Sequence, residues 1–476
     1  MRNFLKKVDQ MGELVHIQGA HWNEEIGALR FMARKGDLDC PAILFDDIPD
    51  YPSGYRVLCG SPNSSRRLAM ILGIEHDSNE PSAYLDLIRK IRDRLKDIKS
   101  IPPKVVKDGP VMENVRKGND VDLFEFPAPK WQPGDSGRYI GTMDAVISRD
   151  PEQERVNMGT YRTMIRDKTS LLTYVDPGKH FHHHRNRWFE LGKDMPVAIC
   201  FGADPLFPVI SGVEFPENLS ELEVAGGFRG QPVEVIKGEI TGLPFPADAE
   251  IVVEGFVSRE QRDIEGPFAE FTGYYGSGAH LEPVINIKAV YFRNQPVLHG
   301  LLTNGRPPKD RIGRRIDFRT FLRSAQLWHQ LELVGIPDIR GVYCHPAGGA
   351  RMWVVISLKQ RYVGHSKQAL AVASQTHTGA FLGRYVITVD EDVDPTYDYD
   401  VIWALSTRSD PVNTIDFLRK TWSGPLDPQI PAELKQFCYN SRALIDACIP
   451  FERKGQYAPT ARFDRNMIKR LKEKFL

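Results

Sequence analysis

The sequence predicts a mixed α/β (α+β) fold in three parts: an N-terminal α/β domain, a central β-rich domain and a C-terminal α/β domain. Its 476 residues are enough for about three domains of roughly 150 residues each. Short strand-like segments between turn residues fill the middle of the chain, and amphipathic helical segments lie on either side of them. We place the domains at residues 1–115, 116–305 and 336–476, with a linking helix in 306–335.

The N-terminal part alternates helical and strand patterns. Apolar residues recur with helical spacing over residues 22–35 and again over 81–101, where charged residues occupy the opposite face. Pro81 suits the start of the second helix, and the two prolines after Ile101 end it. A short apolar strand is expected at 41–45.

The central part has the pattern of an antiparallel sheet or barrel. One helix is expected in it, at residues 219–226. The expected strands are 139–148, 156–165, 170–174, 195–201, 233–236, 250–257 and 284–292.

The C-terminal part returns to alternating strands and helices, which is typical of an α/β unit. Helices are expected at 318–335 and 366–376, and strands at 342–344, 352–358 and 385–389. The tail ends in a basic amphipathic helix, 465–475, for which we expect a place on a neighbouring subunit.

Composition excludes several classes of function. The chain has 62 basic and 62 acidic residues, and this balance argues against a general nucleic-acid binder or a polybasic membrane anchor. We find no apolar stretch long enough to span a membrane and no signal peptide, so we expect a cytoplasmic protein. The six scattered cysteines predict reduced, mostly buried thiols instead of disulfides or a zinc site.

Two segments contain candidate acid–base chemistry. Glu265 and Glu270 lie on either side of a Gly-Pro break, which could turn both carboxyl groups into one pocket or belong to a solvated loop. Asn157 and Arg162 would face opposite sides of a regular strand, so a bulge is needed before they can share a site.

Two further segments could bind a metal ion. Four histidines, His180, His182, His183 and His184, could supply ligands or lie on the surface. Glu221 precedes Val-Ala-Gly-Gly, and a carboxylate beside such glycines could hold a hard cation next to a phosphate or simply begin a helix.

Taken in order, these segments resemble the UbiD family of decarboxylases, and among them most closely the hydroxybenzoate decarboxylases. The resemblance covers essentially the whole chain. It rests on Asn157 followed by Arg162, Lys179 next to His180, Glu221 before Val-Ala-Gly-Gly, Glu265-Gly-Pro-Phe-Ala-Glu270 before Thr-Gly-Tyr-Tyr, and the acidic run from Val389 to Pro395 leading to 401–408. The family implies a central split β-barrel that binds flavin and a C-terminal oligomerisation domain.

The resemblance also implies a cofactor, prenylated FMN, which a separate UbiX-type prenyltransferase makes. Mn²⁺ (or Mg²⁺) and K⁺ tie the cofactor phosphate to family members. By position Asn157, His180 and Glu221 match the metal ligands, which suit a hard cation, and Ser211 matches a potassium ligand. The full set of matching cofactor contacts is Asn157, Thr160, Tyr161, Arg162, Lys179, His180, Ser211, Glu221 and Arg384, the last as a contact to the phosphate.

The implied activity is the reversible decarboxylation of an aromatic acid. Arg162, Glu265 and Glu270 match the family's catalytic trio, in which Arg162 holds the carboxylate, Glu270 donates a proton and Glu265 holds Arg162. We expect a hydroxylated benzoate, with heteroaromatic or α,β-unsaturated acids as the alternative, and pocket residues from 318–327 and 406–410. Family members form homodimers or homohexamers. The alternatives from other classes are an FMN reductase on a similar barrel and a non-catalytic metal-binding subunit.

Overall fold

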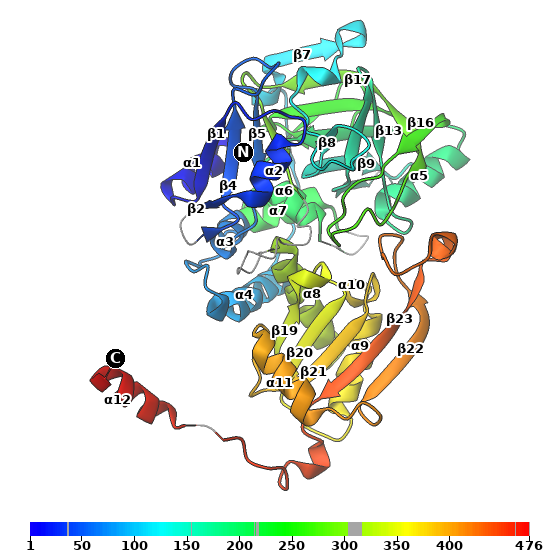
Figure 1. The fold of residues 1–476 in the computed structure, drawn as a ribbon. Coiled ribbons are helices and arrows are strands. Elements are labelled where there is room, and N and C mark those ends of the chain that lie inside the picture. Colours follow the sequence, from blue (N-terminus) through cyan, green and yellow to red (C-terminus); the bar gives the residue numbers. More distant parts are fainter. Residues whose placement is uncertain are drawn as a thin grey trace.

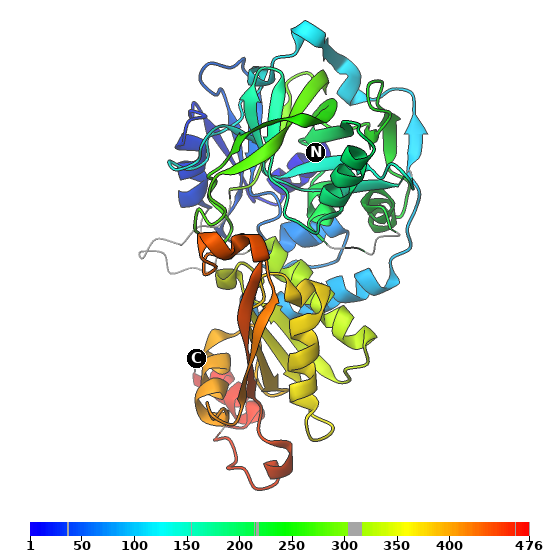
Figure 2. The ribbon, with the colours of Figure 1, turned by 90° about the vertical axis from the view of Figure 1, so that its right-hand side faces the viewer.

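The computed structural model describes residues 1–35, 38–153, 155–213, 215, 219–302, 317–461 and 463–475. It has two bodies joined end to end, as Figures 1 and 2 show from two sides. The upper body contains the N-terminal and central parts of the chain, and the lower body contains the C-terminal part. The mixed α/β fold predicted from the sequence is confirmed. The first part of the expected linking helix, 306–316, lies outside the described residues.

The N-terminal part folds around a four-stranded sheet in the order β1-β4-β5-β18. These strands are Leu14–Gln18, Ala42–Asp46, Arg56–Cys59 and Val297–Gly300. Four helices belong to this part of the chain: α1 (Arg2–Gln10), α2 (Glu25–Met32), α3 (Ser65–Leu72) and α4 (Tyr84–Asp97). The fourth strand comes from the end of the central region, so the two regions share one continuous body.

The central part is a nine-stranded antiparallel sheet. Along its path lie β10 (Val156–Gly159), β9 (Asp144–Arg149), β13 (Met195–Phe201), β16 (Ile251–Glu265), β17 (His280–Phe292), β12 (Ser170–Thr173), β11 (Thr163–Asp167) and β8 (Tyr139–Gly141). A ninth strand, β7 (Asn114–Lys117), pairs with β17. Every residue of β13 is buried, because neighbouring strands and packed side chains cover it on all sides.

The helices of the central part cover both faces of this sheet, with the first on one face and the other two on the opposite face. They are α5 (His180–Glu190), α6 (Leu206–Ser211) and α7 (Glu221–Arg229). A small sheet, β15-β14-β6, lies nearby and is formed by Pro244–Pro246, Glu234–Lys237 and Lys104–Val106. A two-stranded ribbon, β2 (Arg34–Lys35) with β3 (Leu38–Asp39), completes the upper body.

The lower body is a five-stranded sheet in the order β19-β20-β21-β23-β22. Its strands are Ile339–Cys344, Trp353–Leu358, Tyr385–Asp390, Tyr439–Ala447 and Ile415–Trp422. The helices are α8 (Phe318–Leu333), α9 (His365–Gln375), α10 (His377–Ala380) and α11 (Asp398–Arg408). The Asp317 side chain caps α8 by accepting a hydrogen bond from the Arg319 backbone N–H at 3.0 Å.

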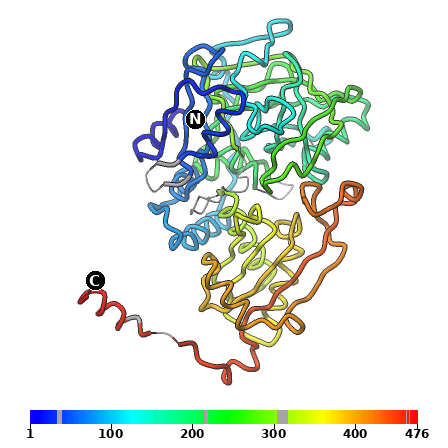
Figure 3. Tube along the Cα trace, in the orientation of Figure 1, coloured from blue at the N-terminus to red at the C-terminus, as the bar shows by residue number. Residues whose placement is uncertain are grey.

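The last helix, α12 (Arg465–Phe475), stands away from the lower body at the end of an extended arm (Figure 3). All six cysteines are free thiols and five of them are buried, which confirms the expectation from the sequence. Among the described helices none is long and apolar enough to cross a membrane.

Candidate functional site

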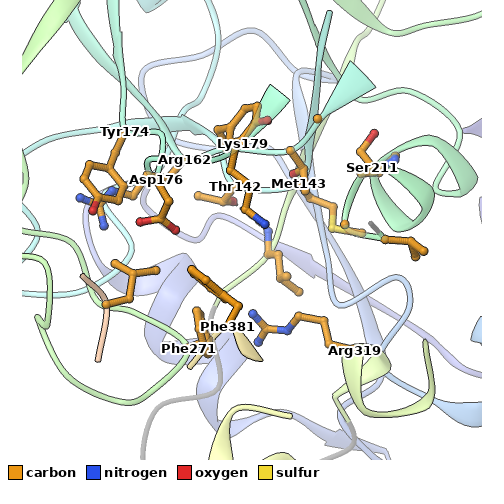
Figure 4. A pocket seen from close by; sticks show the side chains of 18 of the residues that line it. Thr142, Met143, Arg162, Tyr174, Asp176, Lys179, Ser211, Phe271, Arg319 and Phe381 are labelled. Atoms are coloured by element: carbon orange, nitrogen blue, oxygen red, sulfur yellow. Dashed lines mark hydrogen bonds between the residues drawn. The ribbon is translucent and has the colours of Figure 1, made fainter. Parts of the chain in front are cut away.

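A cavity of about 290 Å³ lies between the central sheet, the helices α5 to α8 and a rim from the lower body. Figure 4 shows polar and charged side chains pointing into it from above and the rings of Phe271 and Phe381 closing it from below. The structure brings Asn157, Thr160, Tyr161, Arg162, Lys179, His180, Ser211, Glu221 and Glu270 to this one cavity. Residues 406–410 do not line it, whereas Phe318, Arg319 and Arg323 of the expected 318–327 segment do.

The prediction of a single strand over 156–165 is wrong, and a break in this strand forms part of the site. The strand stops at Gly159 and a new one starts at Thr163, with a different partner strand. Asp144 on β9 causes the break, because its Oδ1 accepts hydrogen bonds from the Thr160 hydroxyl and the Tyr161 backbone N–H, both at 3.1 Å. These bonds replace sheet pairing, so Asn157 and Arg162 reach the same cavity without the bulge that a continuous strand requires. The expected strand over 139–148 is likewise divided, into β8 and β9.

Arg162 joins two glutamates in a buried cluster. Its Nε and Nη2 donate to Oε1 and Oε2 of Glu265 at 2.9 and 2.6 Å, and its Nη1 donates to Oε1 of Glu270. Nη1 also donates to the Ser277 hydroxyl at 3.0 Å. The two-pronged bond to Glu265 fixes the plane of the guanidinium. Glu270 therefore faces the cavity at the end of a rigid arrangement.

The bend between the two glutamates depends on Gly266. Glu265 is the last residue of β16 and pairs with His280, and the chain turns away immediately afterwards. Gly266 has φ +84°, and a Cβ on it would lie 2.4 Å from the carbonyl oxygen of Gly278. A side chain does not fit there, so glycine permits the turn that brings Glu270 back to Arg162.

Burial shifts the acid–base balance of this cluster. Removal from water raises the pKa of Glu270 to about 7, against the opposing attraction of Arg162, and the nearby Asp176 and Glu265 carboxyls raise it further. Burial alone would lower the pKa of Arg162, but Glu270 and Glu265 outweigh it and raise that pKa, so the guanidinium stays charged. Glu270 can thus carry an exchangeable proton near neutral pH.

The other end of the cavity has the donor set of a hard-cation site. His180 Nδ1 lies 3.1 Å from Asn157 Oδ1, and Glu221 begins α7 beside them. Burial raises the pKa of Glu221 to about 7, as expected for a carboxylate without a counter-cation. The Ser211 hydroxyl and Asn157 Nδ2 are buried and have no hydrogen-bond partner within the described ranges. These residues therefore fit a cation bound by oxygen and nitrogen ligands.

No group of three or more His, Cys, Asp or Glu side chains that could hold a metal occurs in the part of the chain that the structure describes. The candidate set has two such residues, His180 and Glu221, and Asn157 is its third member. The helix α5 places two of the remaining histidines. His184 lies one turn after His180 and is buried against the Ser148 hydroxyl at 3.0 Å, and burial lowers its pKa to about 4, whereas His183 is exposed.

The glycines after Glu221 serve packing and not a phosphate loop. They lie within α7, which runs on to Arg229, beyond the expected end at 226. A Cβ on Gly226 would lie 2.6 Å from the Ile101 carbonyl oxygen, and one on Gly227 would lie 2.3 Å from that of Lys99. The glycines let α7 pack closely on this neighbouring backbone and hold Glu221 in place.

Arg384 is not at this cavity. It lines a separate hollow of the lower body, beside Tyr385, and its Nη2 binds both carboxylate oxygens of Asp427 at 2.6 Å. The cations that line the cavity besides Arg162 are Lys179, Arg319, Arg323 and Arg351. Of these, Arg323 has a buried Nη1 without a hydrogen-bond partner among the described residues.

The sequence did not point to several residues of the site. Ser277 and Tyr139 contact the trio, the latter by donating from its hydroxyl to Glu265 Oε1 at 2.8 Å. Asp176 lines the cavity three positions before Lys179, in an Asp-Pro-Gly turn that could have drawn attention. Tyr139 leaves no comparable signal, because nothing in a strand pattern tells which tyrosine faces a distant carboxylate.

Three family models match consecutive parts of the chain. They describe the N-terminal, Rift-related and C-terminal domains of 3-octaprenyl-4-hydroxybenzoate carboxy-lyase and cover residues 5–89, 104–307 and 317–447. The chain belongs to the UbiD family. It is a UbiD-type carboxy-lyase. This result favours a decarboxylase over the two alternatives from other classes, an FMN reductase and a non-catalytic metal-binding subunit.

Two relatives match nearly the whole chain. A pyrrole-2-carboxylic acid decarboxylase from Pseudomonas aeruginosa is 32% identical over 97% of this chain and 94% of its own. A phenolic acid decarboxylase from Streptomyces sp. is 30% identical over 94% of this chain and 92% of its own.

Solved structures of the UbiD class share the fold. The enzyme HmfF from Pelotomaculum thermopropionicum, in complex with FMN, superimposes with a TM-score of 0.85 at 25% identity over 100% of this chain and 99% of that one. The closed form of vanillic acid decarboxylase from Sedimentibacter hydroxybenzoicus superimposes with a TM-score of 0.85 at 27% identity, over 99% of this chain and 98% of that one.

Proposed function

We propose that the protein decarboxylates an aromatic acid, first of all a hydroxylated benzoate, with prenylated FMN as electron acceptor and Arg162, Glu265 and Glu270 as the catalytic trio. The observation that carries the proposal is the buried Glu265–Arg162–Glu270 cluster at one end of a cavity that also contains the donor set of a hard-cation site. Relatives that act on pyrrole-2-carboxylic and phenolic acids, and a structural neighbour in complex with FMN, support it.

When bound, the prenylated flavin supplies the electron sink that the departing carboxylate requires. Arg162 orients the substrate carboxylate, since its guanidinium is charged and fixed by Glu265. Glu270 hands a proton to the ring carbon that loses carbon dioxide. The rings of Phe271 and Phe381 cover the cavity and exclude water from this carbon.

Asn157, His180 and Glu221 would hold Mn²⁺ or Mg²⁺, and Ser211 would contact K⁺, and these ions would supply positive charge for the cofactor phosphate. Thr160, Tyr161 and Lys179 would contact the flavin. Arg323 replaces Arg384 as the proposed basic partner of the phosphate, because it lines the cavity and its buried Nη1 has no hydrogen-bond partner among the described residues. We further propose a cytoplasmic homodimer or homohexamer that receives its cofactor from a UbiX-type prenyltransferase, with domains 1–115, 116–305 and 336–476.

The test is co-expression with such a prenyltransferase, followed by the mass and absorbance of the bound cofactor and a screen of aromatic acids for carbon dioxide release. Prenylated flavin with carbon dioxide release supports the proposal. Unmodified FMN with nicotinamide oxidation, or purified protein that takes up no flavin, contradicts it.

The rate should depend on pH through Glu270. Its pKa is raised to about 7, so the proton that it donates is present below pH 7 and lost above it. We expect kcat to be level on the acid side and to fall about tenfold per pH unit above 7. Steady-state rates from pH 5.5 to 9 measure this, and a kcat that rises through pH 7 would assign Glu270 the role of a base.

Tyr139 should position the trio from outside the cavity. Tyr139→Phe removes the hydrogen bond to Glu265, and we expect kcat to fall about tenfold with KM and flavin content unchanged, as for the loss of a bond to a charged group. Tyr291→Phe is the matched control, since Tyr291 donates to Glu254 at 2.9 Å in the same sheet, away from the cavity. Equal losses of kcat in both variants would mean that Tyr139 only stabilises the folded protein.

A further inference from the structure

Asp176 is a carboxyl group of the cavity that belongs neither to the trio nor to the candidate cation ligands. It lies in the loop between β12 and α5 and lines the cavity. Its Oδ1 is shielded from solvent and has no hydrogen-bond partner in the described part of the chain. Figure 4 shows the carboxyl group between Tyr174 and Lys179, pointing into the open space.

The surroundings place Asp176 beside the reacting end of the cavity. The Tyr174 hydroxyl shares a hydrogen bond with the Asp176 carboxyl, while the Tyr174 ring lies under the Arg162 guanidinium at 4.3 Å from its centroid. Phe271 and Phe381 close the same space from the opposite side. An aromatic ring that rested on these phenylalanines with its carboxylate at Arg162 would have Asp176 near its edge.

A carboxyl oxygen that is shielded from water without a partner costs free energy until a ligand supplies a donor. An ionised carboxylate accepts hydrogen bonds only, and a protonated one retains an accepting oxygen. Burial raises the pKa of Asp176, whereas Lys179, Tyr174, Arg162 and Arg351 lower it. In either protonation state the group can accept a hydrogen bond from the edge of an aromatic ring.

We propose that Asp176 selects substrates by accepting a hydrogen bond from a donor on the aromatic ring, either a phenolic hydroxyl or a ring N–H. The inference rests on the proposed function and narrows its substrate class to aromatic acids that carry such a donor. Rings that lack one leave Asp176 unpaired and are discriminated against.

Two pairs of acids isolate the donor. Pyrrole-2-carboxylate and furan-2-carboxylate have the same ring size, but the first has a ring N–H where the second has a ring oxygen. 4-Hydroxybenzoate has a hydroxyl group where 4-fluorobenzoate has a fluorine. Calorimetry on the flavin-loaded protein gives Kd for each acid, and carbon dioxide release gives kcat/KM. For each pair we divide the Kd and the kcat/KM of the donor-bearing acid by those of the donor-lacking acid. Comparing this ratio among the wild type, Asp176→Asn and Asp176→Leu cancels the intrinsic reactivity of the acids.

The control is Glu282→Gln. Glu282 is a carboxyl whose pKa burial raises to about 7, and it faces Arg185 outside the cavity. We expect the wild type and this control to favour the donor-bearing acid of at least one pair. In Asp176→Leu this preference should fall about 10- to 100-fold in Kd and kcat/KM, with a smaller loss in Asp176→Asn, whose amide oxygen still accepts. Binding of the donor-lacking acids should not change.

Equal slowing of all acids together with loss of flavin would overturn the inference, because Asp176 would then serve the cofactor through Lys179. An unchanged ratio, or binding of no acid at all, would overturn it too. Donor-selective binding that depends on Asp176 but yields no carbon dioxide would support it while the proposed decarboxylation fails.

Discussion

Glu270→Gln is expected to lower kcat by about 10²- to 10⁴-fold, the usual contribution of a positioned general acid. A glutamine keeps the shape of the side chain and can still accept from Arg162, but it has no proton to give to the ring carbon. The flavin and metal contents should stay at wild-type levels, because Glu270 lies at the opposite end of the cavity from the cation site. Single-turnover carbon dioxide release, with cofactor content by absorbance and mass, measures both.

Glu282→Gln serves as the control here as well, since it neutralises a carboxyl with a similarly raised pKa near the trio but outside the cavity. Loss of flavin from Glu270→Gln would show that the residue supports cofactor binding. Turnover at the wild-type rate in a fully loaded Glu270→Gln enzyme would remove Glu270 from the proton transfer.

Glu221→Ala is expected to yield protein poor in both Mn²⁺ and flavin. The substitution removes the carboxylate from the proposed ligand set and leaves Asn157 and His180 with a metal affinity at least about tenfold weaker. We expect the flavin content to fall with the metal content, because the proposed cation would tie the cofactor phosphate to the protein. Metal analysis and flavin absorbance of the purified protein measure the loss without any assay of turnover.

The matched control is Glu223→Ala, in the same first turn of α7 but outside the cavity. It should retain both metal and flavin. A Glu221→Ala variant that is loaded normally would overturn the assignment of Glu221, and equal losses in the two variants would indicate that α7 itself is disturbed.

Local patterns in the sequence predict several elements well. The strand expected at 195–201 coincides with β13, and the helix expected at 465–475 coincides with α12. The first is a continuous short apolar run and the second has one uninterrupted helical periodicity, so neighbouring residues alone identify them. The helix expected at 22–35 is shorter, Glu25–Met32, because the chain leaves the helical conformation at Ala33.

Partners that are distant in sequence decide the rest. Strand β16 runs on to Glu265, beyond the expected end at 257, because β17 begins at His280 and pairs with this extension. Arg384 pairs with Asp427, which no local pattern links to it, and so lies away from the cavity where it was expected.

The sequence by itself determined the family, the order of its motifs and which arginine and glutamates to compare with a catalytic trio. Only the tertiary structure decided that these side chains meet. The break after Gly159 depends on hydrogen bonds from Asp144, and the approach of Glu270 to Arg162 depends on a turn packed against Gly278. Both are contacts between residues 12 to 17 positions apart that belong to different elements, and the periodicity of neighbouring residues does not predict them.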